Sequence, residues 1–282
     1  MADSIARLIA AASQQLTAAS DSALLDAEVL MAHCLNKPRS FLRAWPEQTL
    51  SDQQHSIFSA LISQRRQGVP VAYLTGEREF WSRSFKVSAS VLIPRPDTEL
   101  IIELSLALLA HQPASQILDL GTGSGIIGIT LAAELPLSRV TACDQSPQAL
   151  EIARDNARRL ETGNIGFLQS DWFSAITDSG FDLIVSNPPY IAADDPHLQQ
   201  GDVRFEPRQA LVSPDQGLQD IRLLADHARQ YLKSGGRLLI EHGYQQQTAV
   251  QAIFKHCNYQ QVTTHCDLAG NPRVTSAQWN PS

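Results

Sequence analysis

The chain is predicted to be an α/β protein in which a doubly wound sheet follows a small helical bundle and a β-hairpin. Short apolar runs rich in β-branched residues alternate with helical patterns from Gln116 onward, as expected when crossover helices join parallel strands. Residues 4–68 show only helical patterns, and residues 73–88 are rich in aromatic and β-branched side chains. We therefore expect a helical domain over residues 1–72, a hairpin linker over residues 73–95 and an α/β domain over residues 96–282.

Local signals mark the limits of the helices in the first part. Ser20 or Asp21 is predicted to cap a second helix, and Ser51 with Gln54 has the spacing of a capping box. Gly68 is a natural helix stop. Taken one at a time, these residues are explained equally well by a structural scaffold that has no binding site of its own. Because appended helical domains often bind a macromolecule, we interpret the whole as a substrate-recognition domain.

The linker is expected to contain a hairpin with its turn at Ser82–Ser84, followed by two closely spaced prolines. The stretch Ile93–Glu99 has the sequence Ile-Pro-Arg-Pro-Asp-Thr-Glu and leads into an apolar helix predicted over Leu100–Ala110. Asp97 and Thr98 are the candidate caps of that helix. By themselves these features indicate a rigid linker and the start of a helix.

A glycine-rich loop follows the first strand of the α/β part. The predicted strand Gln116–Leu120 leads into Gly121-Thr122-Gly123-Ser124-Gly125, after which an apolar helix begins. Glycines allow positive φ and close backbone approach, and a helix start presents unpaired N–H groups, so this loop can hold an anionic or carboxylate-bearing cofactor. The stretch Gly123–Gly128 also satisfies the dinucleotide pattern Gly-x-Gly-x-x-Gly, which is weak when it stands alone.

Two further residues follow the next strands at their carboxyl ends. Asp144 comes after the strand predicted over Arg139–Cys143 and can accept hydrogen bonds from both hydroxyls of a ribose. Trp172 follows a strand around Ile165–Gln169, and its indole can pack against an adenine ring. The simpler explanations are that Asp144 is an exposed acidic residue in a loop and that Trp172 is part of the apolar core. Together with the glycine loop, however, the two residues supply the contacts that an adenosine-containing cofactor needs.

The most informative stretch is Asn187-Pro188-Pro189-Tyr190, which follows the apolar run Phe181–Ser186. That run has the length and composition of a buried strand, so we expect the tetrapeptide at its carboxyl end, where open α/β sheets bind ligands. Consecutive prolines lack backbone N–H groups and have restricted φ, which holds the Pro188 carbonyl outward beside the Asn187 side-chain carbonyl. These two acceptors match a planar NH₂ group, and the Tyr190 ring can lie against its carrier. The alternative is a turn that only ends the strand.

The remainder of the chain continues the alternation and ends in a hairpin. A loop that includes Phe205–Leu211 is expected to close over the site. The later elements are predicted as a helix over Leu218–Leu232, a turn at Ser234–Gly236, a strand over Arg237–Glu241, a helix over Gln246–Phe254, and strands near Gln261–Asp267 and Arg273–Trp279. The last two strands form the hairpin, which gives the sheet an antiparallel edge strand.

Composition limits the classes of partner. The 282 residues carry a formal net charge of −7, which argues against a protein that holds nucleic acid chiefly through its phosphates. We find no signal-peptide pattern and no apolar run long enough to span a membrane. The cysteines lack paired metal-ligand spacing and fit reduced thiols, so we expect a cytoplasmic protein without a metal site; they are Cys34, Cys143, Cys257 and Cys266.

In combination, these motifs resemble known methyltransferases. Asp119–Gly125, Asp144 and Asn187–Tyr190, in this order, resemble the class I S-adenosylmethionine-dependent methyltransferases that modify an amino group. With Ile93–Glu99, Glu206–Leu211 and Asp267–Val274 added, nearly the whole chain is similar to the HemK/PrmC family of release factor glutamine methyltransferases. One departure is Val212–Gly217, where we expect a glycine pair and Asp-Gly, so the conformation of this loop stays open.

The resemblance implies a Rossmann-like class I methyltransferase sheet with S-adenosylmethionine as cofactor. It implies that Gly121, Thr122, Gly123, Ser124 and Gly125 contact the methionine part, Asp144 the ribose and Trp172 the adenine side. Asn187, Pro188, Pro189 and Tyr190 would bind the substrate, with Asn187, Pro188 and Tyr190 catalytic and Asn187 also beside the cofactor. The substrate would be the glutamine side-chain amide in the Gly-Gly-Gln motif of peptide chain release factors. We expect a monomer that binds no membrane and no nucleic acid stably.

Two other functions stay open at this level. A DNA or RNA methyltransferase could use the same tetrapeptide to grip the exocyclic amino group of a flipped adenine. The acidic balance and the absence of an evident basic target-reading segment argue against it. A non-catalytic adaptor would retain the fold and bind a partner through its helices, but the intact glycine loop and tetrapeptide argue against that.

Overall fold

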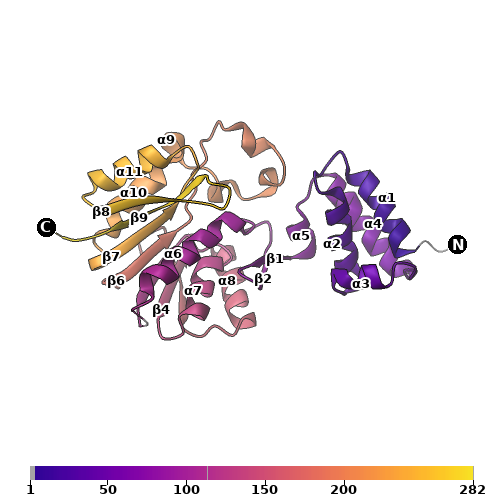
Figure 1. Ribbon diagram of the computed structural model, residues 1–282, viewed down its shortest axis with the longest axis horizontal. Helices are drawn as coiled ribbons and strands as arrows, with labels where there is room; N and C mark the ends of the chain where they lie inside the picture. The colour runs from indigo at the N-terminus through magenta and orange to yellow at the C-terminus, as the bar shows by residue number, and fades with distance from the viewer. Residues whose placement is uncertain (1–3, 113, 282) are drawn as a thin grey trace. The chain divides into compact units, whose positions relative to one another are not determined.

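The computed structural model describes residues 4–112 and 114–281, and its internal contacts divide the chain into two compact units. The first unit comprises the residues up to Glu77 together with Pro196–Phe205. The second comprises Arg78–Asp195 together with the residues from Glu206 onward. A segment from the later half of the sequence therefore belongs to the first, helical unit. Figure 1 shows the elements of both units.

The first unit consists mainly of helices packed around one apolar core. Its helices are α1 (Ile5–Leu16), α2 (Ala23–Leu35), α3 (Arg39–Ala44), α4 (Asp52–Arg66) and α5 (Val71–Thr75), with the 3₁₀ turns η2 (Pro196–Gln199) and η3 (Val203–Phe205). Apolar side chains of α1, α2 and α4 meet in the core, among them the buried Ile5, Leu30 and Phe58. The helical pattern predicted for residues 4–68 is confirmed.

Two of the three helix signals predicted in this unit are confirmed. Ser51 and Gln54 form a capping box: Ser51 Oγ accepts from the Gln54 N–H at 3.3 Å, and Gln54 Oε1 accepts from the Ser51 N–H at 2.9 Å. Gly68 follows α4 with a φ of 94°, as a helix stop requires. The cap predicted at Ser20 or Asp21 is wrong, because α2 begins at Ala23 after Ser22.

A buried arginine fastens residues 196–205 to the helices of the first unit. Arg65 Nε donates to Asp26 Oδ2 at 2.7 Å, and Arg65 Nη1 donates to Asp202 Oδ1 at 3.0 Å. Nη1 also donates to two backbone carbonyls in the turn after α4. Because loss of one partner would leave a buried charge uncompensated, these contacts hold the later segment firmly to the helices.

The predicted hairpin is formed by β1 (Glu77–Phe80) and β2 (Arg83–Lys86). Its turn is Trp81–Ser82, with φ values of 51° and 56°, so the turn predicted at Ser82–Ser84 is wrong by one residue. Two successive positive φ values are typical of a two-residue type I′ turn, whose twist matches that of the strands. The unusual conformation of Trp81 is secured by its N–H, which donates to Glu99 Oε1 at 2.9 Å.

The second unit contains a seven-stranded sheet with the order β5-β4-β3-β6-β7-β9-β8. The strands are β3 (Gln116–Leu120), β4 (Arg139–Asp144), β5 (Ile165–Gln169), β6 (Phe181–Ser186), β7 (Leu232–Glu241), β8 (Gln260–Cys266) and β9 (Pro272–Gln278). Neighbours from β5 to β7 are parallel, and β9 is antiparallel to both β7 and β8. The hairpin was expected to place an antiparallel strand at the edge of the sheet. The strand that runs antiparallel to its neighbours is β9, which lies inside the sheet, and β8 forms the edge.

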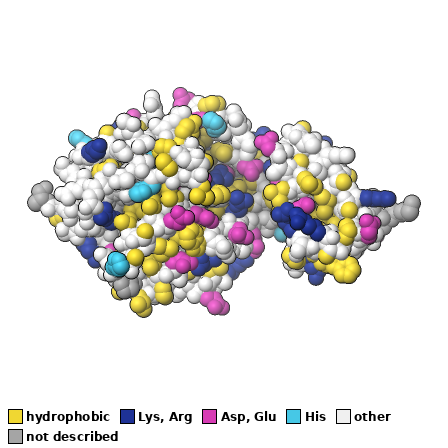
Figure 2. Space-filling view, in the orientation of Figure 1, with side chains coloured by type: hydrophobic (Ala, Val, Ile, Leu, Met, Phe, Trp, Pro, Cys, Tyr) yellow, Lys and Arg dark blue, Asp and Glu magenta, His cyan; other side chains and the backbone are white. Residues whose placement is uncertain are grey.

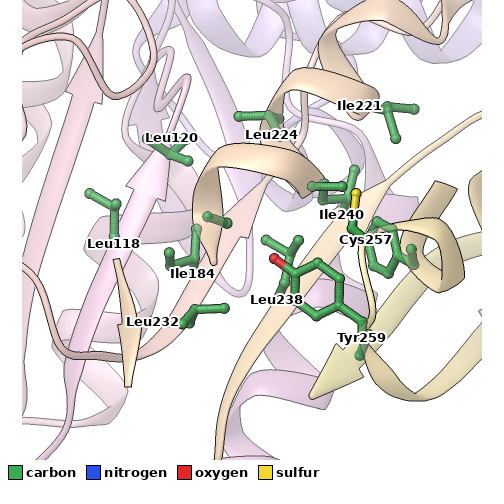
Figure 3. Close-up of a cluster of buried hydrophobic side chains, with 14 of the residues drawn as sticks. Leu118, Leu120, Ile184, Ile221, Leu224, Leu232, Leu238, Ile240, Cys257 and Tyr259 are labelled. Atoms are coloured by element: carbon green, nitrogen blue, oxygen red, sulfur yellow. The ribbon is translucent and has the colours of Figure 1, made fainter. Parts of the chain in front are cut away.

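Helices cover both faces of this sheet, as Figure 1 shows. Helices α6 (Glu99–Leu109), α7 (Ile126–Glu134) and α8 (Pro147–Arg159) pack on one face, and α10 (Gln219–Ala228) and α11 (Gln247–His256) pack on the other. Alternate residues of β3 serve the two cores, because Ile117 packs with the first group while Leu118 and Leu120 pack with the second (Figure 3). This alternation is expected of a strand buried on both faces.

One boundary in the C-terminal third differs from its prediction. Helix α10 ends at Ala228 and β7 already begins at Leu232, so the turn predicted at Ser234–Gly236 lies within a strand. The strand contains Gly235 with a φ of 84° and a register shift against β6. Glycine marks irregularities within strands as well as turns, which is why the pattern misleads here. The last helix and the final hairpin agree with prediction to within two residues.

The register of the strands brings distant segments to one edge of the sheet. The glycine loop, Asp144 and Asn187 stand at the ends of β3, β4 and β6. On β3, the last residue before the loop pairs with the residue before Asp144 and with the residue before Asn187. The residue before Glu241 on β7 pairs with the residue before Asn187 in turn. The strand order also reverses between β3 and β6, and open α/β sheets bind ligands at the carboxyl ends beside such a reversal.

Candidate active site

A cleft opens at this edge of the sheet and encloses about 920 Å³, including space open to solvent. Its walls come from the carboxyl ends of the parallel strands and from the segments 90–98 and 207–210. The predicted site residues that line it are Gly121, Thr122, Gly123, Ser124, Asp144, Trp172, Asn187 and Pro189. Gly125, Pro188 and Tyr190 do not border it. The cleft therefore brings together most of the predicted set, although the residues come from four strands.

The glycine loop is shaped by its backbone hydrogen bonds. The N–H groups of Gly121 and Thr122 both donate to the Cys143 carbonyl at 2.9 Å. Gly121 and Gly125 have φ values of 73° and 88°, and a Cβ atom at Gly125 would lie 2.5 Å from the Ile129 side chain. A residue with a side chain would be strained at either position, so the glycines are required by the conformation of the loop.

A buried carboxylate holds this loop from within the sheet. Asp119 Oδ2 accepts from Thr122 Oγ1 at 2.6 Å and from the Gly128 N–H at 2.9 Å. A Cβ atom at Gly128 would lie 2.9 Å from the same oxygen, so the third glycine of the dinucleotide-like pattern is explained by the approach of Asp119. Burial raises the pKa of Asp119 to about 6, although both hydrogen bonds lower it. The sequence motif includes Asp119 but does not indicate this role.

Asp144 lies at the carboxyl end of β4, and both its oxygens already accept backbone hydrogen bonds. Oδ2 accepts from the Gly123 N–H and Oδ1 from the Ser146 N–H, each at 2.9 Å. Burial raises the pKa of Asp144, and these hydrogen bonds act in the opposite direction. A carboxylate has about four lone-pair positions, so each oxygen can still accept a ribose hydroxyl.

Trp172 is half-buried, with a φ of 47°, in the turn after β5. Its ring lies over Gly121, because a Cβ atom at Gly121 would be 3.4 Å from ring atom Cζ3. Part of the ring packs against the apolar core and part borders the cleft. Its explanation as a core indole alone is therefore incomplete.

Asn187 borders the cleft and is held at one end of its side chain. Nδ2 donates to Thr98 Oγ1 at 3.1 Å. Within the described residues no group donates a hydrogen bond to Asn187 Oδ1 or to the carbonyl of the buried Pro188. The two acceptors predicted for the tetrapeptide therefore have no competing partner within the described chain.

Tyr190 packs against the apolar core, and its hydroxyl donates to Glu241 Oε1 at 3.3 Å. The ring does not border the cleft. The predicted packing of the ring against the group that carries the NH₂ stays a prediction. Burial raises the pKa of the Tyr190 hydroxyl, and the neighbouring Glu241 charge raises it further.

Sequence reasoning missed Glu241, which is 1% exposed at the end of β7. Burial raises its pKa to about 7, and this effect is opposed by the nearby Thr98 hydroxyl, the charge of Arg273 and the hydrogen bond from Tyr190. Its Oε2 has no hydrogen-bond partner in the described chain. The available signal was its position, since an acidic residue directly after the apolar run Leu238–Ile240 needs partners at the sheet edge.

Thr98 stands at the N-cap position of α6, as one of the two predicted candidates, but the side-chain capping hydrogen bond expected of it is absent, and the cap predicted at Asp97 is wrong. Neither side chain caps α6, and both lie in the 3₁₀ turn η1 (Pro96–Thr98) that precedes it. Thr98 accepts the hydrogen bond from Asn187, and Asp97 pairs with Arg273 Nη2 at 3.1 Å. Because both side chains bind residues that are distant in sequence, the segment around η1 is part of the site and not only a linker.

The loop after the tetrapeptide is joined to the same segment. Glu206 has a fully buried side chain that forms an ion pair with Arg95, and its Oε2 accepts from the Ile93 N–H at 3.2 Å. Pro207, Gln209 and Ala210 then border the cleft. This pairing explains why a proline-flanked arginine and a proline-flanked glutamate occur in two separate loops.

The loop Val212–Gly217, whose conformation the sequence left open, forms the irregular turn α9 (Pro214–Gly217). Two of its residues, Asp215 and Gln216, have positive φ values of 53° and 54°. Gln246 Nε2 donates to the carbonyls of Tyr190 and Gln216 at 3.0 and 3.1 Å. The turn is thereby fastened to the end of the tetrapeptide.

Two surface features bear on the class of partner. On the face shown in Figure 2, basic and acidic side chains are interspersed and form no continuous basic stripe. Within residues 4–112 and 114–281, no helix combines the length and the apolar character that crossing a membrane requires.

The sheet order, the glycine loop after β3 and the Asn-Pro-Pro-Tyr stretch after β6 together define a class I methyltransferase. Solved structures agree with this fold. A methyltransferase from Pyrococcus furiosus aligns with a TM-score of 0.53 at 16% identity, covering 79% of this chain and 98% of that one. The catalytic domain of hMettl16, solved with the MAT2A 3′UTR hairpin 6, aligns with a TM-score of 0.57 at 15% identity, covering 78% and 81%.

Sequence comparison then identifies the family. Residues 7–76 match the model of the PrmC N-terminal domain, and residues 100–203 match that of the methyltransferase small domain. The release factor glutamine methyltransferase of Vibrio cholerae is 50% identical, over 97% of this chain and 96% of its own. That of Escherichia coli K12 is 49% identical, over 93% and 94%. The chain belongs to the family of release factor glutamine methyltransferases.

Proposed function

We propose that the protein transfers a methyl group from S-adenosylmethionine to the side-chain amide nitrogen of the glutamine in the Gly-Gly-Gln motif of peptide chain release factors. The observation that supports it best is the setting of Asn187. Its Nδ2 is bound to Thr98, its Oδ1 has no partner within the described chain, and it borders the same cleft as the glycine loop. The relatives named above carry this activity in their names.

The residues around the cleft fit S-adenosylmethionine. Residues 121–124 border the cleft, and the loop leads into the start of α7, whose first N–H groups have no partner within the helix and can face a carboxylate. Asp144 can accept the ribose hydroxyls, and Trp172 presents part of its ring to the cleft. When bound, S-adenosylmethionine supplies a methyl group on a positively charged sulfur. The chain's own residues hold and orient the nitrogen that accepts the methyl group.

The acceptor explains why the tetrapeptide is needed. An amide nitrogen is a poor nucleophile because its lone pair is delocalised, and it gains positive charge as the new C–N bond forms and the C–S bond breaks. Asn187 Oδ1 and the Pro188 carbonyl can each accept a hydrogen bond from one of the two N–H groups of the amide. These hydrogen bonds orient the nitrogen and stabilise the developing charge. The proton that the nitrogen loses passes to solvent. Tyr190 holds the tetrapeptide in place through Glu241.

The partner and the setting belong to the same proposal. We take the helical unit to recognise the release factor, because residues 7–76 match the model of the PrmC N-terminal domain and appended helical domains often bind a macromolecule. We take the protein to act as a monomer in the cytoplasm, without stable binding to nucleic acid. The interspersed charges in Figure 2 support the last point for the face shown there.

Methyl transfer from labelled S-adenosylmethionine tests the function. The purified protein is incubated separately with a release factor, with its Gly-Gly-Gln→Gly-Gly-Ala variant, and with duplex DNA. We expect label on the wild-type release factor alone, which would establish both the substrate and the accepting residue. Label on DNA alone would contradict the proposal and favour methylation of adenine, for which steep salt dependence of DNA binding would be the second sign.

A further inference from the structure

Exposed apolar side chains occur at both edges of the sheet in the second unit. Among its described residues, four large apolar side chains are exposed: Leu137, Leu168, Tyr244 and Leu268. Strand β8 runs in the same direction as β7, because both are antiparallel to β9. Tyr244 follows β7 and Leu268 follows β8, so both lie at the carboxyl edge of the sheet, where the cleft opens. Leu137 precedes β4 and lies at the opposite edge.

Tyr244 is 54% exposed and belongs to a turn that is hydrogen-bonded to the tetrapeptide. Gln246 closes this turn, because its N–H donates to the Gly243 carbonyl at 2.9 Å and its Oε1 accepts from the Gly243 N–H at 2.8 Å. Gln246 Nε2 then donates to the Tyr190 carbonyl at 3.0 Å. The turn is therefore held in place at the end of the tetrapeptide, while the Tyr244 ring stays open to solvent.

Leu268 is fully exposed in the turn between β8 and β9. Asp267 Oδ1 accepts from two backbone N–H groups of this turn, each at 2.9 Å, which gives the turn a defined conformation. Asp267 Oδ2 also pairs with Arg273 Nη2 at 3.5 Å, and the same nitrogen pairs with Asp97 Oδ2 of η1 at 3.1 Å. The turn that carries Leu268 is thus joined to the segment that borders the cleft on its other side.

The chemistry of the acceptor says what covers these two side chains. A glutamine that belongs to a protein brings the surface around it to the edge of the cleft when its side chain enters. Single exposed apolar side chains are common on proteins. Two of them on hydrogen-bonded turns that are joined to the site differ from that background, because side chains presented by a fixed backbone lose little entropy when a partner covers them.

We propose that Tyr244 and Leu268 form an apolar rim that binds the release-factor surface beside the Gly-Gly-Gln motif. The inference rests on the proposed function, which makes a protein side chain the occupant of the cleft. Neither residue borders the cleft itself. The rim therefore contacts the substrate equally in the ground state and in the transition state, so it contributes to binding and not to the chemical step.

Steady-state kinetics provide the first test. Tyr244→Ala and Leu268→Ala should each raise the KM for the release factor by about 5–30-fold and leave kcat within about twofold of wild type. Tyr244→Phe keeps the ring and should behave like wild type. Leu137→Ala is the matched control, because Leu137 is 71% exposed at the opposite edge. Melting temperatures should change little in all four variants, since the substituted side chains are exposed. An unchanged KM in either alanine variant of the rim, or an equal rise in Leu137→Ala, would overturn the proposal.

A second copy of this chain is the competing occupant of the rim. Sedimentation velocity of the wild-type protein and of Leu268→Ala distinguishes the two partners. We expect both proteins to sediment as monomers. A wild-type dimer that Leu268→Ala dissociates would show that the rim is an interface between copies, and would overturn the proposal.

A direct binding measurement separates this inference from the proposed function. The Gly-Gly-Gln→Gly-Gly-Ala release factor cannot accept the methyl group but keeps the surface beside the motif. Its Kd, measured by titration calorimetry, should rise by about 5–30-fold in Tyr244→Ala and in Leu268→Ala and stay unchanged in Leu137→Ala. Wild-type affinity in the two rim variants would overturn the inference even if release factors are methylated. Rim-dependent binding without methylation of the wild-type release factor would support the inference and contradict the proposed function instead.

Discussion

Gly217 lies directly against the carbonyl oxygen of Tyr190, so that a Cβ atom at Gly217 would be 2.0 Å from that oxygen. Gly217 also has a φ of 84°, which residues with side chains rarely adopt. The backbone of the tetrapeptide and the turn α9 are therefore packed together too closely for any side chain to fit between them. The approach depends on two separate properties of glycine, and a matched pair of variants can separate them.

Gly217→Ala should displace the end of the tetrapeptide and lower kcat/KM by at least about 10-fold, because the clash is with backbone and cannot be relieved by a side-chain rotation. Gly180→Ala is the control, since Gly180 has a φ of 80° and a Cβ atom there would meet no described atom within 4 Å. Both variants share the backbone strain, of roughly 1–2 kcal/mol. Equal losses of activity in the two variants would show that strain alone, and not contact with Tyr190, explains Gly217.

Asn187→Ala should slow methylation of the release factor by at least about 10–100-fold, because it removes one of the two acceptors on a nitrogen that gains charge. The circular dichroism spectrum should stay close to wild type. Steady-state kinetics with labelled methyl donor measure the effect. Near wild-type turnover in a properly folded Asn187→Ala protein would refute the proposed role of the tetrapeptide.

Trp172→Ala should raise the Kd for S-adenosylmethionine by roughly 5–30-fold, because it removes an apolar surface at the cleft and exposes Gly121. Isothermal titration calorimetry measures this directly. Trp45→Ala is a suitable control, since Trp45 is 60% exposed in the helical unit. If the two variants bind S-adenosylmethionine equally well, Trp172 has a structural role only.

The pKa of Asp119 predicts how stability depends on pH. Because burial raises this pKa from 3.8 to about 6, the folded protein holds the proton more tightly than the unfolded chain between these values. The contribution of Asp119 to the free energy of unfolding should therefore fall as the pH rises from about 4 to about 6, by on the order of 2–3 kcal/mol, and then level off.

Asp119→Asn provides the comparison for this prediction, because it keeps the size of the side chain and an oxygen acceptor but does not titrate. Calorimetric melting of both proteins across the pH range should show the wild type losing melting temperature relative to the variant as the pH rises. A difference that stays constant with pH would mean that Asp119 does not titrate in this window.

The parallel strands and the positions of the glycine loop, Asp144 and Asn187 can be predicted from the sequence because their signals are local. A buried strand, a loop with positive φ and a Pro-Pro pair each depend on residues within a few positions of one another. The turn at Trp81–Ser82 lies one residue before its predicted position, because its conformation is secured by Glu99, which is distant in sequence. Asp97 and Thr98 likewise make no capping hydrogen bond, because their side chains contact Arg273 and Asn187, which are distant in sequence.

The sequence by itself determined that a buried strand ends in Asn187–Tyr190 and that a glycine loop precedes a helix, which is enough to indicate the chemistry. Only the tertiary structure decided that Thr98, 89 positions before Asn187, holds its side chain, and that Tyr190 donates to the buried Glu241. The physical reason is that these contacts depend on the register of β6 against β7 and on the placement of η1. A hydroxyl next to a helix start has the same local pattern whether it caps the helix or orients a distant amide.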